Sequence, residues 1–117
     1  MKEIMPRDMT AILYTSKDIG RRKGSMFAYS LDCNFGAFGN NPQDATNNLA
    51  RALANHIWSS AEEGINPFVG NEKGYARLGK YFANNSEMPL EFSAKTDTIA
   101  LHAYDLRNRR SALINSL

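Results

Sequence analysis

The sequence has few of the side chains that carry chemistry. Its single cysteine, Cys33, leaves no partner for an internal disulfide or a cysteine-based metal cage. Its only histidines are His56 and His102, which lie far apart and form no metal-binding His-x-x-x-His or His-x-Glu spacing. There is also no Gly-x-Ser-x-Gly motif and no Walker loop. Nothing in the sequence supports a metal, a cofactor or a catalytic site, and we expect a non-enzymatic protein.

Long hydrophobic runs are absent too. No apolar stretch approaches the roughly 20 residues of a membrane-spanning helix. Residues 1–6 lack the apolar core of a signal peptide. We therefore expect a cytoplasmic protein without membrane contact. A length of 117 residues with a hydrophobic fraction of 43% predicts one domain over residues 1–117.

An excess of charge of one sign is also missing, because the formal net charge is only +2. Basic residues gather in two groups, at residues 21–23 and 73–80. Aromatic residues accompany the second group within residues 73–82. Solvated turns and helix faces explain both groups, but cations beside aromatic rings also suit nucleic acids. The candidate nucleic-acid contacts are Arg21, Arg22, Lys23, Lys73, Arg77 and Lys80.

Strand patterns occur at both ends of the chain. Residues 9–15 and 25–32 are rich in β-branched and aromatic residues, and the glycine-bearing segment 17–24 joins them as a hairpin loop. A brief third strand is expected at 35–38, unless Gly36 forms a bulge. Residues 90–94 and 98–104 indicate one or two more strands. The pattern predicts an α+β fold with an antiparallel sheet of three to five strands.

The strongest signal is a helix over residues 42–63. Asn41 is a suitable N-cap, Pro42 suits the first helical position, and Gly64 suits the end. Apolar residues recur every three or four positions and predict one face on the sheet: Ala45, Leu49, Ala52, Leu53, His56, Ile57 and Ala61. We expect His56 to be a satisfied or partly buried histidine, and Trp58 to be a packing residue or a lid over the core edge. The same reasoning predicts that Cys33 is a small buried hydrophobe.

Two more helices are expected after this one. Tyr75, Leu78 and Phe82 have helical spacing within residues 73–84, although two glycines weaken the pattern. Asp105 can cap a C-terminal helix with Leu106 and Leu113 on its inner side. Residues 64–72 have the composition of an ordered loop with apolar anchors.

The segment that opens the long helix resembles the HicB-like antitoxin fold. Gly39-Asn40-Asn41-Pro42-Gln43-Asp44-Ala45 is similar to the family's G-D-T-x-E-E-A segment, which follows a three-stranded meander. Asn48, Ala52 and Leu53 continue the likeness, which covers about residues 9–63. The Pro-Gly turn that the family has before its third strand is missing here.

The resemblance implies a non-enzymatic binding module. Its implied partner is a small toxin ribonuclease or another protein, and it implies a homodimer. We expect an exposed sheet edge or a helix face to dock the protein partner, because a small meander leaves unpaired edge groups for an added strand or for dimerisation. Two alternatives stay open: a nucleic-acid-binding domain that uses the basic residues at 21–23 and 73–80, and a small hydrolase that uses His56 or His102.

Overall fold

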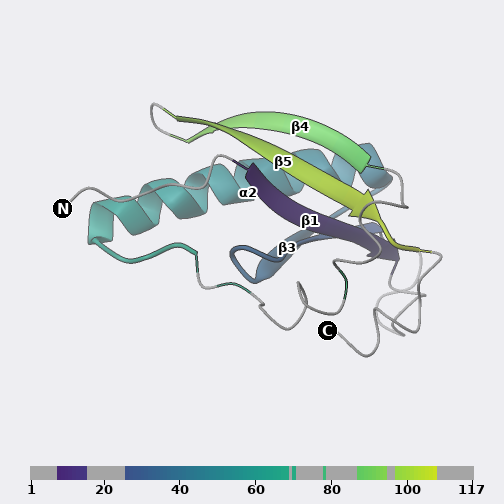
Figure 1. Ribbon diagram of the computed structural model, residues 1–117, viewed down its shortest axis with the longest axis horizontal. Coiled ribbons are helices and arrows are strands. Elements are labelled where there is room, and N and C mark those ends of the chain that lie inside the picture. Colours follow the sequence, from purple (N-terminus) through teal and green to yellow (C-terminus); the bar gives the residue numbers. More distant parts are fainter. Residues whose placement is uncertain are drawn as a thin grey trace.

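The computed structural model describes residues 8–15, 26–68, 70, 78, 87–94 and 97–107. These residues form five strands and one long helix in the order β1 (Asp8–Thr15), β2 (Met26–Ser30), β3 (Phe35–Gly39), α2 (Pro42–Glu63), β4 (Glu87–Ala94) and β5 (Asp97–Asp105). The helix lies across one face of the sheet (Figure 1). The expected α+β architecture is therefore confirmed.

The sheet is mixed, and the prediction of a purely antiparallel sheet is wrong. Its strand order is β3-β2-β1-β5-β4, with β5 parallel to β1 and every other pair antiparallel. Pro89 accounts for the edge position of β4, because a strand that contains proline lacks a ladder donor and belongs at an edge. The following strand, β5, lies between β4 and β1. In that position β5 runs parallel to β1.

The three-stranded meander at the start of the fold matches the sequence pattern closely. β2 pairs with β1 from Thr15↔Met26 to Ala11↔Ser30, and β3 pairs with β2 from Met26↔Gly39 to Ser30↔Phe35. The second pairing is continuous, so Gly36 forms no bulge. Residues 31–34 make the connecting turn, in which Asn34 has φ 60° and its N–H donates to Ser30 O at 2.9 Å. Asparagine tolerates this left-handed conformation better than most residues, so the turn needs no glycine.

α2 begins and ends where the sequence indicates. The Asn41 side chain accepts a hydrogen bond from Asp44 N at 2.8 Å, and Gly64 adopts φ 68°. The Gly64 and Ile65 amides donate to Ala61 O and Ser60 O, which satisfies two carbonyls at the helix end.

The inner face of α2 is rotated slightly from the expected one. Thr46, Ala50 and Ser60 are buried, whereas Ala52, His56 and Ala61 are only half-buried. Trp58 is not a packed core residue, because 52% of it is exposed, and its role as a lid over the core edge stays a prediction. Because apolar residues occur on several sides of the helix, the sequence pattern did not define which side faces the sheet.

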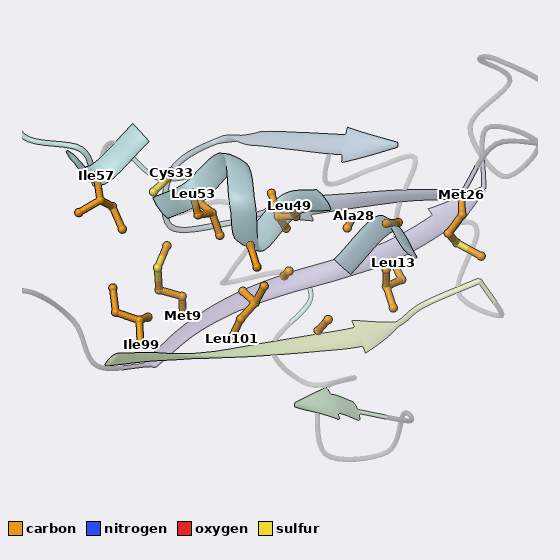
Figure 2. Close-up of a cluster of buried hydrophobic side chains, with 14 residues drawn as sticks. Met9, Leu13, Met26, Ala28, Cys33, Leu49, Leu53, Ile57, Ile99 and Leu101 are labelled. Carbon is orange, nitrogen blue, oxygen red and sulfur yellow. The ribbon is translucent and has the colours of Figure 1, made fainter. Parts of the chain in front are cut away.

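The core lies between α2 and the sheet. Figure 2 shows Leu49, Leu53 and Ile57 of α2 reaching toward the strands, where Met9, Leu13 and Leu101 are also fully buried. A second buried cluster covers the other face of β1 and consists of Ile12, Tyr14, Leu31, Leu78 and Leu106. β1 is thus buried on both faces, which accounts for its unbroken apolar run.

Other expectations fall partly or wholly outside the described residues. The loop at 17–24 and the C-terminal helix beyond 107 lie outside, and the helix at 73–84 lies outside except for Leu78, which is buried. β4 begins at Glu87, earlier than expected, because an edge strand tolerates Pro89. In the 64–72 loop, Pro67 is buried and Phe68 packs on the core, but Ile65 is 53% exposed.

Candidate protein-binding edge

The two edges of the sheet differ in how far they are protected. β4 carries Pro89 and the exposed Glu91, and both features discourage pairing with another strand. β3 has the sequence Phe-Gly-Ala-Phe-Gly, with no proline and no charge. Among the described residues, β3 pairs only with β2. β3 is therefore the edge better suited to receive a further strand.

The backbone groups on the outer side of β3 follow from the register. Leu31 N donates to Thr10 O across the β1–β2 pair, and hydrogen-bonding direction alternates along an antiparallel strand. Ala28 of β2 therefore directs its backbone groups toward Ala37 of β3. It follows that the N–H and C=O groups of Gly36 and Phe38 point outward. The Asn48 side chain donates to Phe38 O at 2.9 Å, so the helix already satisfies one of these acceptors.

A row of aromatic rings lies beside this edge, on the face of the sheet opposite α2. The Phe27 ring lies 4.5 Å from that of Phe38 and 5.3 Å from that of Tyr14. Tyr29 extends the row at 6.5 Å from Phe27. Exposure rises along it, from 2% at Tyr14 to 41% at Phe38. The inner rings hold Phe38 in place, so this aromatic side chain is exposed and also supported by packing.

Gly36 makes room for the aromatic row. A Cβ at this position would fall against Ala28 O and lie 2.5 Å from Cζ of Phe27. A real Cβ cannot occupy that space without displacing the ring or the strand. The absence of a side chain at Gly36 therefore leaves room for the Phe27 ring, which contacts Phe38.

Charge in the described part of the chain is mainly acidic. Its only basic residues are Arg51 and Arg107, and Arg107 binds Asp105 through hydrogen bonds and an ion pair. Its carboxylates with described side chains are those of Asp8, Asp32, Asp44, Glu62, Glu63, Glu91 and Asp105. The remaining basic residues of the sequence belong to segments outside the description. The whole chain has a formal net charge of +2, so these carboxylates do not set the charge of the molecule.

All six candidate nucleic-acid contacts fall outside the described residues: Arg21, Arg22, Lys23, Lys73, Arg77 and Lys80. The structure therefore does not bring them together or separate them, and their role stays a prediction. The aromatic row on β2 and β3 was not predicted as a site. Its signal in the sequence was the alternation of Phe27 and Tyr29, which places both residues on one face of a strand.

The two histidines lie on opposite sides of the sheet and do not form a joint site. His56 Nε2 lies 2.9 Å from Pro67 O, and its ring makes an edge contact with Phe35 at 5.0 Å. This confirms the expected satisfied histidine. His102 projects from the face opposite α2, where its Nε2 lies 2.9 Å from Asp8 Oδ1. Among the described residues, no three His, Cys, Asp or Glu side chains could hold a metal ion together.

Cys33 is buried, as expected, and only 7% of it is exposed. Burial raises the pKa of its thiol to about 12, and the nearby Asp32 carboxylate adds to this. A hydrogen bond with Ser30 opposes the rise but does not offset it. The thiol is therefore protonated at neutral pH, which leaves it a poor nucleophile.

The pKa of Asp105 is shifted in the opposite direction, below its usual value. Burial alone would raise the pKa of this carboxyl group, but its hydrogen bonds and ion pair with Arg107 outweigh burial and lower the pKa. Asp105 is the last residue of β5, and its carboxylate also accepts a hydrogen bond from Arg107 N at 3.1 Å. The contact fixes the chain where it leaves the sheet, which is a structural role.

Comparisons with protein families, curated proteins and solved structures found no match. In the part of the chain that the structure describes, no helix is long and apolar enough to cross a membrane.

Proposed function

We propose that this chain is a non-enzymatic, HicB-like binding module that receives an extended segment of a basic protein along β3. One observation carries the proposal: the edge strand has neither charge nor proline, and the ring of Phe38 is exposed beside it. An added strand would pair with the outward groups of Gly36, while an apolar side chain of the partner would cover Phe38. Exposed aromatic residues supported by packing are typical binding hot spots.

One further feature agrees with this proposal. The meander β1-β2-β3 followed by the capped helix α2 has the element order on which the HicB resemblance depends. A small basic toxin ribonuclease is the partner that the resemblance implies.

The first experiment is a capture from native lysate with immobilised wild-type chain and two charge variants. Phe38→Lys places a cation on the proposed docking edge. Glu91→Lys makes a matched change on the opposite edge, where Glu91 is exposed on β4. We expect a basic protein on the wild-type chain and on Glu91→Lys, with at least tenfold less on Phe38→Lys.

The captured protein is then added to the ¹⁵N-labelled chain. We expect the largest amide shift changes at Gly36 and Phe38, with little change in β4. Circular dichroism and urea unfolding show whether both variants are folded. Equal capture by the two variants, or shift changes centred on β4, would show that β3 is not the docking edge.

A further inference from the structure

The β3 edge carries a hydrogen bond that comes from the helix and not from a strand. The side-chain amide of Asn48, on α2, donates to the backbone oxygen of Phe38 at 2.9 Å. This oxygen is one of the outward groups of β3, to which the N–H of an added strand would donate. A second donor would therefore have to share the oxygen with Asn48 or displace the Asn48 amide.

The register gives the two positions of an added strand different needs. Gly36 directs both its N–H and its C=O outward, so a residue that faces it in an antiparallel strand can donate and accept. The residue that faces Phe38 lies two positions earlier in that strand. Because Phe38 O already accepts from Asn48, this earlier residue needs no N–H. Proline lacks the N–H and is tolerated in an edge strand.

The side chains at these two positions would lie on the aromatic row. Residues directly opposite each other in an antiparallel pair project to the same face of the sheet. A proline that faces Phe38 therefore places its ring against the exposed aromatic ring. The residue that faces Gly36 meets no side chain on β3, but the Phe27 ring lies there, with Cζ 2.5 Å from where a Cβ of Gly36 would be. A large apolar side chain at this position would cover Phe27.

We propose that the segment docked at β3 runs antiparallel to it and has the pattern proline, any residue, large apolar residue. The proline lies opposite Phe38 and the apolar residue opposite Gly36. Asn48 determines this specificity, because its hydrogen bond occupies the acceptor that an N–H at the proline position would use. The inference rests on the proposed docking at β3 and deepens it by defining the sequence of the partner segment.

Peptides with blocked termini test the pattern by titration of the ¹⁵N-labelled full chain. The first peptide is Lys-Thr-Pro-Thr-Leu-Thr-Lys. The second has alanine in place of proline, and the third has N-methylalanine, which lacks both the N–H and the proline ring. The fourth has the proline and leucine exchanged. We expect shift changes centred on Gly36 and Phe38. The proline and N-methylalanine peptides should bind about fivefold more tightly than the alanine peptide, and the exchanged peptide more weakly than the first.

The variant Asn48→Ala tests the cause of this preference. Without the side-chain amide, Phe38 O can accept from the N–H of the alanine peptide, so the fivefold difference between the N-methylalanine and alanine peptides should disappear or reverse. Asn47→Ala is the matched control, because Asn47 is the exposed neighbour on α2 and accepts a hydrogen bond from Gln43. This control should keep the wild-type preference. Urea unfolding checks that both variants are folded, and the comparison of peptides on the wild type needs no variant.

Four results would overturn the proposal. They are equal binding of the proline and alanine peptides to the wild type, tighter binding of the exchanged peptide, an N-methylalanine preference that Asn48→Ala leaves unchanged, and a lack of shift changes on β3 with every peptide. The docking of a protein at β3 is judged separately, by the capture with Phe38→Lys. If that capture succeeds while the peptides fail, only the sequence pattern is wrong. If Phe38→Lys captures as much as the control, the docking edge itself is wrong.

Discussion

On the face of the sheet opposite α2, the ring of Phe27 occupies the space that a side chain at position 36 would need. The ring of Phe27 lies over the glycine, where any Cβ would meet both the ring and the Ala28 carbonyl. The ring in turn contacts Phe38, which we propose as the main side chain of the docking edge. A side chain at Gly36 would therefore disturb the ring that packs against Phe38.

We predict that Gly36→Ala lowers the free energy of unfolding by roughly 1–3 kcal/mol, the usual cost of overpacking. Urea unfolding at neutral pH measures this. The combined variant Gly36→Ala/Phe27→Leu should recover part of the loss, because leucine removes the ring atoms that the new methyl group meets. If Gly36→Ala unfolds at the wild-type urea concentration, the ring does not occupy this space.

The raised pKa of the Cys33 thiol predicts how the stability of the chain changes with pH. Its thiol has a pKa raised from 9.0 to about 12 in the folded chain by burial and by the Asp32 carboxylate. A raised pKa means that the unfolded chain releases the proton first, so this contribution to stability is complete below pH 9 and is lost between pH 9 and 12. The wild type should therefore lose stability relative to Cys33→Ala as the pH rises from 8 to 10.5.

Urea unfolding of both proteins at each pH isolates the thiol, because all other titrating groups are shared. A difference between the two proteins that stays constant over this range would contradict the raised pKa. At pH 8 we also expect iodoacetamide to modify Cys33 only in the unfolded chain.

At the scale of elements, α2 was the easiest to predict because its signals are local. Asn41, Pro42 and Gly64 define its ends through the backbone geometry of their own turns, and no distant contact is needed to interpret them. β4 was harder, since Pro89 argues against a strand until its place at the edge of the sheet is known. The exposure of Trp58 was also hard to predict, because helical periodicity alone did not show which side of α2 faces the core.

We predict that Asn41→Ala costs about 1 kcal/mol of stability, because Asp44 N loses its capping acceptor. Asn55→Ala is the matched control, since Asn55 is exposed within the helix, and it should be neutral or slightly stabilising. Gly64→Ala should also cost about 1 kcal/mol, through its positive φ alone, because no atom lies within 4 Å of the added Cβ.

Thermal unfolding followed by circular dichroism measures all three variants. If Asn55→Ala lost as much stability as Asn41→Ala, the capping hydrogen bond of Asn41 would not be the cause of the loss. Gly64→Asn should keep most of the stability that Gly64→Ala loses, because asparagine tolerates the left-handed conformation.

At the scale of the whole molecule, the sequence indicated an α+β class but not the order of the strands. The patterns at 90–94 and 98–104 predict strands, yet nothing local in them states that β5 lies between β1 and β4. That arrangement depends on long-range pairing, such as Thr10 with His102, and on the edge position of β4. A docking edge was expected, but its residues could not be named for a similar reason, because Phe38 becomes an edge residue only through the strand order.

The open edge at β3 is the central claim of this account, and amide hydrogen exchange in the isolated chain tests it most directly. The register directs the Gly36 amide outward and the Ala37 amide toward Ala28. We expect Gly36 to exchange at least about 100-fold faster than Ala37 in a ¹⁵N-resolved experiment, as a solvent-exposed amide beside a ladder amide should. Equal protection of the two amides would show that the β3 edge is already covered, and would contradict the account.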